Sequence, residues 1–341
     1  MRKVCIAIAL VLVVVAAGAM AFGSLAWGRL HEPYKGYAGA AQLVVIAPGT
    51  GTAAIGRALV SAGVLRDEVT FRAALWWTGR ARELQAGEFR FDRPLAAVDV
   101  VERLARGNVY TRAITFPEGL TIREMATIYE SRGFGAAARF IEAAANASLI
   151  RDLDARAVDL EGYLFPDTYA LPRETRPSRL VAMMVDRFRA TYTDEWRRAA
   201  AEQGLTTRQV VALASLVEKE TGKAGERPIV AAVYRNRLKI GMGLQADPTV
   251  VYALQKAGRY DGNIRRVDLA LDSPYNTYRH AGLPPGPIAA PGAASLEAAL
   301  TPAHVSYLYF VSRNDGSHAF AQTLAEHNRN VREFQILYFR R

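Results

Sequence analysis

The amino-acid sequence predicts an α+β protein with three parts: an N-terminal transmembrane helix, a small α/β module and a larger mixed α+β domain. Three observations carry this prediction. An uncharged apolar run opens the chain, short β-branched segments then alternate with amphipathic helical segments, and the rest mixes helices with short strands without a regular βα rhythm. We place a tail at residues 1–3, the helix at 4–28, a linker at 29–42, the module at 43–110 and the large domain at 111–341.

The apolar run extends from Val4 to Gly28 and follows the basic pair Arg2-Lys3. About 25 residues at a rise of about 1.5 Å cover roughly 37 Å, enough to cross a hydrocarbon core of about 30 Å. A cleaved signal peptide is the alternative, because Ala19–Ala21 has the small-residue pattern of a cleavage site. We favour a single-pass anchor in the cytoplasmic (inner) membrane, since apolar residues continue to Trp27. The basic pair favours a cytoplasmic N-terminus, which puts the rest of the chain in the periplasm or extracytoplasmic space.

A strand, a turn and an amphipathic helix recur three times, within residues 42–65, 87–107 and 112–133. Each copy has residues typical of strands, then a turn with Pro or Gly, then apolar residues at helical spacing. In the third copy Thr121 and Glu124 have the pattern of a capping box. Small modules of this arrangement resemble the LysM glycan-binding module. A packing domain that only spaces the large domain from the membrane is the alternative.

The large domain is predicted to contain helices near residues 139–145, 177–192, 207–220 and 229–238. Two short strands, 308–312 and 318–322, flank the sequence Asn314-Asp315-Gly316, which is a strong signal for a hairpin turn. Helices combined with an antiparallel hairpin are typical of the α+β class.

The composition excludes several kinds of site. The chain has 43 Lys and Arg against 33 Asp and Glu, a net charge of +10, but the basic residues are scattered and no nucleic-acid-binding signature is present. We therefore expect no nucleic-acid partner, and an anionic lipid surface or cell-wall polymer instead. The single cysteine, Cys5, excludes an intramolecular disulfide. Metal-ligand spacing, a phosphate loop and a Ser-His-Asp pattern are missing, so we expect no metal and no cofactor.

Two glutamates, Glu218 and Glu220, interrupt the apolar stretch Leu213–Gly222. A capping box at Thr206–Gln209 predicts the start of a helix that Gly222 would close. At 100° per residue the two carboxylates lie about 200° apart, on the two flanks of the apolar stripe, with Lys219 on the solvated side. The predicted stripe consists of Val210, Leu213, Ala214 and Val217. Geometry alone does not choose between the glutamates, and both could simply be flank charges of an amphipathic helix.

Three further stretches, 161–172, 233–254 and 272–292, are rich in residues that shape clefts and contact sugars. Aromatic rings stack on pyranose rings, while Asn, Gln, Asp and Arg bind hydroxyl and amide groups. The motifs "EGYLFPDTY", "ASLVEKET", "LQADPTV", "SPYNTY", "GLPPGPIA" and "HAFAQTL" occur in this order. As a set they resemble the endolytic murein transglycosylases, the MltG or YceG-like family, and the resemblance covers the chain from its anchor nearly to its C-terminus.

The resemblance implies a membrane-anchored enzyme that cuts nascent peptidoglycan strands within the chain and so ends their elongation, close to peptidoglycan synthases. In that family the first glutamate of the "VEKET" motif is the catalytic acid, which here is Glu218. The bond cut joins N-acetylmuramic acid to N-acetylglucosamine by a β-1,4 linkage, and the product has a 1,6-anhydro end. Near the apolar stripe Glu218 would be partly desolvated, which raises the pKa of a carboxyl and suits a proton donor. One carboxyl suffices for this route, whereas a hydrolase needs two.

Candidate substrate contacts are polar side chains of the later motifs: Gln245, Asp247, Asn276, Tyr278 and His318. Asp247 is also the most credible second carboxylate, although an Asx turn before Pro248 is the alternative. His318 lies beside the hairpin turn, where a structural role is the alternative. Arg235 and Arg237 would meet peptide-stem carboxylates or lie on the solvated surface.

Two other functions fit the sequence. One is a non-catalytic, membrane-tethered peptidoglycan binder that serves as a scaffold for synthases. The other is a conventional hydrolase that uses Glu218 with Asp247. A pull-down without strand shortening would indicate the binder, and a product that has gained water would indicate the hydrolase.

Overall fold

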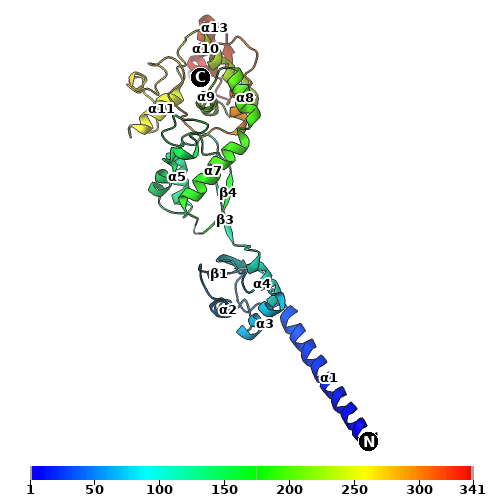
Figure 1. The fold of residues 1–341 in the computed structure, drawn as a ribbon. Helices are drawn as coiled ribbons and strands as arrows, with labels where there is room; N and C mark the ends of the chain where they lie inside the picture. The colour runs from blue at the N-terminus through cyan, green and yellow to red at the C-terminus, as the bar shows by residue number, and fades with distance from the viewer. Residues whose placement is uncertain (1, 174, 339–341) are drawn as a thin grey trace. The chain divides into compact units, whose positions relative to one another are not determined.

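The computed structural model describes residues 2–173 and 175–338 and divides into two compact units. Unit 1 comprises the chain up to Arg112 together with Ala170–Arg173, and unit 2 comprises Ala113–Tyr169 and the chain after Arg173. The chain passes between the units in β3 (Thr111–Thr115) and β4 (Thr168–Pro172), which pair with each other (Figure 1). The predicted boundary at residue 110 lies two residues earlier, and the sequence did not indicate the return of 170–173.

Unit 1 begins with α1 (Arg2–His31), whose segment Leu10–His31 is long and apolar enough to cross a membrane. The helix continues into the predicted linker because its last turn packs on the module. Leu30 is buried there, and Arg29 forms an ion pair with Asp67 at 2.9 Å. The other elements of the unit are β1 (Gln42–Ile46), α2 (Thr52–Ser61), α3 (Glu68–Thr78), β2 (Gly87–Phe91) and α4 (Ala97–Ala105).

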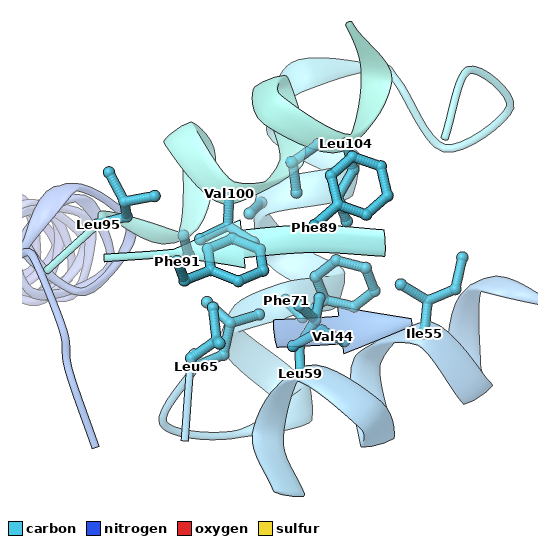
Figure 2. Packing of buried hydrophobic residues seen from close by; sticks show 14 of the residues in the cluster. Val44, Ile55, Leu59, Leu65, Phe71, Phe89, Phe91, Leu95, Val100 and Leu104 are labelled. Carbon is cyan, nitrogen blue, oxygen red and sulfur yellow. The ribbon is translucent and has the colours of Figure 1, made fainter. Parts of the chain in front are cut away.

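The core of unit 1 lies between a two-stranded antiparallel sheet and three helices (Figure 2). In β1, Val44 and Ile46 are buried while Leu43 and Val45 are exposed, which is the alternation of a strand with one covered face. The strands pair in the register Gln42↔Phe91 to Ile46↔Gly87. The labelled side chains that fill the core come from both strands and all three helices: Val44, Leu59, Phe71, Phe89, Phe91, Val100 and Leu104. A small α/β module is therefore present.

Unit 2 is mixed α+β. Its helices are α5 (Ile122–Ser131), α6 (Ala137–Ala144), α7 (Pro177–Thr191), α8 (Asp194–Glu202), α9 (Thr207–Glu220), α10 (Arg227–Lys239), α11 (Asp247–Lys256), α12 (Ala293–Leu300) and α13 (Leu324–Val331). Its short helical turns are η1 (Ala147–Leu149), η2 (Ala224–Glu226), η3 (Asp268–Ala270) and the π-helical η4 (Arg332–Leu337). Its remaining strands, β5 (Tyr309–Ser312) and β6 (His318–Ala321), pair antiparallel around a turn in which Asn314 has a φ of 65°. The predicted hairpin is thus confirmed.

Helix α9 is the centre of unit 2. The predicted capping box is present, because Thr206 and Gln209 satisfy each other's backbone N–H groups. All eight residues from Val210 to Val217 are buried, and four helices, α8, α10, α11 and α12, pack against this helix. The expected one-sided apolar stripe was therefore wrong over these turns. Thr221, with φ −138° and ψ 132°, ends the helix in an extended conformation.

Candidate active site

The last turn of α9 carries Glu218 out of the apolar core. Its side chain is only 7% exposed, as expected for a carboxyl close to the core. The Oε2 atom accepts a hydrogen bond from the backbone N–H of Gly292 at 3.0 Å. Gly292 is the N-cap of α12, and the positive end of a helix dipole favours an anion. Glu218 is thus a buried carboxyl with one oriented donor.

A second carboxyl, Glu118, lies beside Glu218. Arg227 Nη2 is 3.5 Å from Glu218 Oε1 and 3.6 Å from Glu118 Oε2, so one guanidinium contacts both groups. Burial raises the pKa of Glu118, and the charge of Glu218 raises it further, although Arg227 lowers it. Arg227 is nearly buried, whereas Glu118 is 47% exposed. Glu118 therefore places a proton-binding group at the solvent-facing side of Glu218.

Two loops hold Glu118 and Glu218 together. The turn before α5 and the proline-rich loop before α12 are joined by two backbone hydrogen bonds, from Gly119 N to Ala290 O and from Ala290 N to Leu120 O, both 2.8 Å. Gly119 has a φ of 77°, a conformation that favours glycine. A β-carbon at Gly292 would collide with Glu118 Oε1. A side chain at position 292 would therefore displace the Glu118 carboxyl from its place beside Glu218.

Glu220 belongs to a different cluster. It accepts a hydrogen bond from the Tyr234 hydroxyl at 2.6 Å. Burial and, to a smaller extent, the charge of Asp247 raise the pKa of Glu220 to about 7, against the lowering effects of Tyr234, His318 and Arg237. Glu220 is thus a carboxyl that changes charge near neutral pH.

Two of the predicted substrate contacts, Asp247 and Tyr278, are brought together beside Glu220. The Tyr278 hydroxyl donates to Asp247 Oδ1 at 2.6 Å. Burial raises the pKa of Tyr278, and Asp247 raises it further. Asp247 is exposed and lies at the start of α11, so the pair presents a carboxylate and an aromatic ring at the surface.

His318 contacts Glu226 on the other side of this cluster. Its Nδ1 lies 2.7 Å from Glu226 Oε2, and its backbone N–H donates to Oε1 at 3.0 Å. Burial alone would raise the pKa of Glu226, but the hydrogen bonds from His318 outweigh it and lower the pKa. Glu226 directly precedes Arg227 in the chain. The contact of His318 with Glu226 therefore holds the β5–β6 hairpin next to the residue whose guanidinium contacts Glu218. This geometry favours the structural alternative for His318.

Gln245 and Asn276 lie in two loops that are bound to each other. Gln245 is exposed and has a φ of 48°, which is strained for a residue with a side chain. The strain is held by Thr277, whose carbonyl accepts from Gln245 N at 3.3 Å and whose hydroxyl accepts from Ala246 N at 3.0 Å. Non-glycine residues in this conformation are common at functional sites.

Asn276 is fully buried, contrary to the expectation of a substrate contact. Its amide donates to the carbonyls of Leu269 and Leu271 at 3.0 and 2.8 Å, and its oxygen accepts from Tyr278 N at 3.0 Å. Asn276 therefore supports the loop that carries Tyr278. A polar residue in a motif gives no signal of whether its side chain faces substrate or backbone.

Arg237 is likewise buried rather than surface-exposed or facing a peptide stem. It donates to the carbonyls of Leu308 and Leu244, both at 2.6 Å, and so joins α10 to the segments that precede β5 and α11. Arg235 is partly exposed and lines cavities of about 770 and 580 Å³. The linings of these cavities do not include Glu218 or the predicted substrate contacts. The candidate site is therefore defined by the contacts among Glu118, Glu218 and Arg227 and not by a cavity.

Comparison with known proteins gives a family and several relatives. A family model described as the YceG-like family matches residues 44–333. A protein of Bacillus subtilis (strain 168) named endolytic murein transglycosylase is 31% identical over 324 residues, which are 90% of this chain and 89% of that protein. A protein of the same name from Streptococcus pneumoniae serotype 2 is 29% identical over 85% of this chain, which spans 58% of that protein.

A solved structure shares the fold. The 2.6 Å crystal structure of a yceG-like protein from Listeria monocytogenes is 28% identical to this chain and superimposes with a TM-score of 0.59. The match covers 85% of this chain and 98% of that one.

Proposed function

Since this chain belongs to the YceG-like family, we propose that it is an endolytic murein transglycosylase, a lytic enzyme that cuts peptidoglycan glycan strands at internal bonds. The observation that carries this proposal is the buried carboxyl of Glu218, held by Gly292 N–H and Arg227 beside the half-exposed Glu118. The two donors orient this carboxyl beside Glu118.

The reaction we propose begins with Glu218 as general acid. It protonates the oxygen that links C1 of N-acetylmuramic acid to C4 of N-acetylglucosamine, and the C1–O bond breaks as positive charge develops on the ring. The C6 hydroxyl of the same muramic residue attacks C1, a C1–O6 bond forms, and the Glu218 carboxylate accepts the hydroxyl proton. Water is neither consumed nor released, and the carboxyl ends in its starting state.

Arg227 and Glu118 have separate roles in this proposal. Arg227 fixes the orientation of Glu218 and stabilises its carboxylate after the proton has left. Glu118 faces the bound strand, where its negative charge would stabilise the positive ring carbon. Gln245, Asp247 and Tyr278 are proposed to contact the strand away from the bond that is cut. They are accessible, and Asp247 and Tyr278 lie near Glu220, on the flank of α9 opposite Glu218.

The test is Glu218→Gln, which keeps the shape of the side chain and removes its titratable proton. We expect a loss of about 10²- to 10⁴-fold in the release of 1,6-anhydro-ended fragments from un-crosslinked glycan strands, with the melting temperature preserved. Mass spectrometry of the products measures this and separates the lytic route from hydrolysis, which adds one water. The matched control is Glu195→Gln, the same change at an exposed glutamate in the first turn of α8. Near wild-type turnover by Glu218→Gln would rule out Glu218 as the acid.

We further propose that α1 crosses the cytoplasmic membrane with Arg2 and Lys3 inside, so that both units face the extracytoplasmic space. The length and apolarity of Leu10–His31 support this arrangement. Because release of new chain ends stops the growth of a strand, a peptidoglycan synthase is the partner we expect near the enzyme. Thiol labelling across the membrane tests the topology, as described below.

A further inference from the structure

Helix α3 has an apolar face that unit 1 does not cover. Val69 and Trp76, seven residues and about two turns apart, lie on the same face and are 65% and 83% exposed. Trp77 beside them is 52% exposed. The opposite face is buried through Phe71 and its neighbours in the core. Single exposed apolar residues are ordinary, but two adjacent tryptophans and a valine on one helix form a patch that fits a partner.

This face is fixed next to the end of α1. Asp67, the N-cap of α3, pairs with Arg29 of α1 at 2.9 Å. Near the other end of α3, the ring of Trp77 meets the ring of Trp27 of α1 edge-on, with centroids 5.3 Å apart. Two contacts from two ends of α3 therefore hold it against the last turns of α1.

These contacts also give the direction of α3. Asp67 and Trp77 are ten residues, or about 15 Å, apart along α3, whereas Trp27 and Arg29 are only about 3 Å apart along α1. Helix α3 therefore runs across the end of α1 and not alongside it. If α1 crosses a bilayer, α3 lies close to the plane of the membrane surface at the end where α1 leaves the lipid.

We propose that the exposed face of α3, formed by Val69, Arg72, Trp76 and Trp77, lies in the head-group zone of the membrane that α1 crosses. Tryptophan rings have an apolar body and one N–H donor, and they concentrate at this depth of a bilayer. Arg72 is exposed between Val69 and Trp76, one turn from each, where its charge suits anionic phospholipid head groups. The inference rests on the proposed membrane crossing and adds a second contact that would fix the orientation of unit 1.

The test uses the full-length protein in vesicles of phosphatidylethanolamine and phosphatidylglycerol, with lipids brominated near the head group or deep in the acyl chain as quenchers. One variant keeps Trp76 as its single tryptophan, with Trp27, Trp77 and Trp196 changed to Phe. Two matched variants have all four tryptophans changed to Phe and carry either Val45→Trp or Ala17→Trp. Val45 is an exposed apolar residue of the same unit on β1, and Ala17 lies within the apolar span of α1.

We expect the shallow quencher to reduce Trp76 emission at least several-fold more than that of Val45→Trp, and the deep quencher to act on Ala17→Trp. Deep quenching at position 17 with equal quenching at positions 76 and 45 would overturn the inference and leave the anchor intact. Absence of quenching at position 17 would overturn both. If Trp76 emission changed on addition of isolated glycan strands and was not quenched by lipid, the face would be assigned to glycan instead. If it changed with the density of protein in the vesicles and was not quenched by lipid, the face would be assigned to a second copy.

Discussion

At the scale of single residues, Glu220 links protonation to stability. Burial raises its pKa from 4.5 to about 7 in the folded protein, with Asp247 adding to the effect. The folded state thus binds this proton more tightly than the unfolded state, so its contribution is complete below about pH 4.5 and is lost as the pH rises through 7. The difference corresponds to roughly 3 kcal/mol between pH 4 and pH 8.

Glu220→Gln should remove this pH dependence, because the amide keeps the shape and does not ionise. Compared with the wild type, the variant is expected to gain stability at pH 8 relative to pH 5 in urea unfolding followed at both pH values. The exposed Glu195→Gln serves as control and should leave the pH dependence unchanged. If the free energy of unfolding changed equally between pH 5 and pH 8 in wild type and Glu220→Gln, Glu220 would not be the group that causes the pH dependence.

Asn276 and Tyr278 are neighbours in sequence with different expected roles. Asn276→Ala removes the amide that three backbone groups use, so we expect a loss of about 1–3 kcal/mol in unfolding free energy. Tyr278→Phe removes one hydroxyl at the surface and should raise KM for glycan strands while the melting temperature stays unchanged. Thermal unfolding and kinetics on both variants measure this. An Asn276→Ala protein with wild-type stability and a raised KM would restore the direct contact that the sequence suggested.

At the scale of elements, the N-terminus of α12 must come close to the turn before α5. Gly292→Ala places a methyl group against the Glu118 carboxyl and so displaces Glu118 or the Gly292 N–H donor to Glu218. We expect at least a tenfold loss of kcat with the helix content unchanged, measured by product release and circular dichroism. Gly222→Ala is the matched control, because a β-carbon there meets no atom within 4 Å. Equal activity of the two variants would show that the close approach is not needed.

Local patterns were sufficient to predict most elements near the site. Thr206 with Gln209 defines the start of α9, and the Asn-Asp-Gly turn defines the hairpin, because both signals lie within a few residues. The contact of Glu118 with Arg227 and Glu218 depends on segments about a hundred residues apart, and helical spacing carries no such information. Glu118 lies between a proline and a glycine of a predicted turn, so only the pairing of that turn with the 287–292 loop makes it part of the site.

At the scale of the whole molecule, the proposed topology gives a labelling pattern. In a Cys5→Ser background, Lys3→Cys should react with a membrane-impermeant maleimide only after spheroplasts are permeabilised, because it lies before the apolar span. Asp315→Cys, in the exposed hairpin turn, should react in intact spheroplasts. Gel shifts of the labelled protein measure both. Labelling of position 3 without permeabilisation would reverse the topology or show that α1 does not cross.

The sequence indicated the order of the anchor, the small module and the large domain. It did not indicate that residues 170–173 return from unit 2 to unit 1. An uncharged run predicts a spanning helix by length alone, and α1 has that length. By contrast, 170–173 joins unit 1 through the pairing of β4 with β3, and strand partners distant in sequence leave no periodic signal. Burial also overrode local pattern in α9, where several neighbouring helices hide residues that a single apolar stripe would leave exposed.

The groups around Glu218 come from widely separated positions: Glu118 early in unit 2, Arg227 in its middle and Gly292 close to its end. A polypeptide still being synthesised therefore lacks the full set until the segment that contains Gly292 has been made. Proteolytic fragments from either end would be equally incomplete. A cell that makes this protein is thus exposed to its lytic chemistry only after the segment around Gly292 has joined the fold.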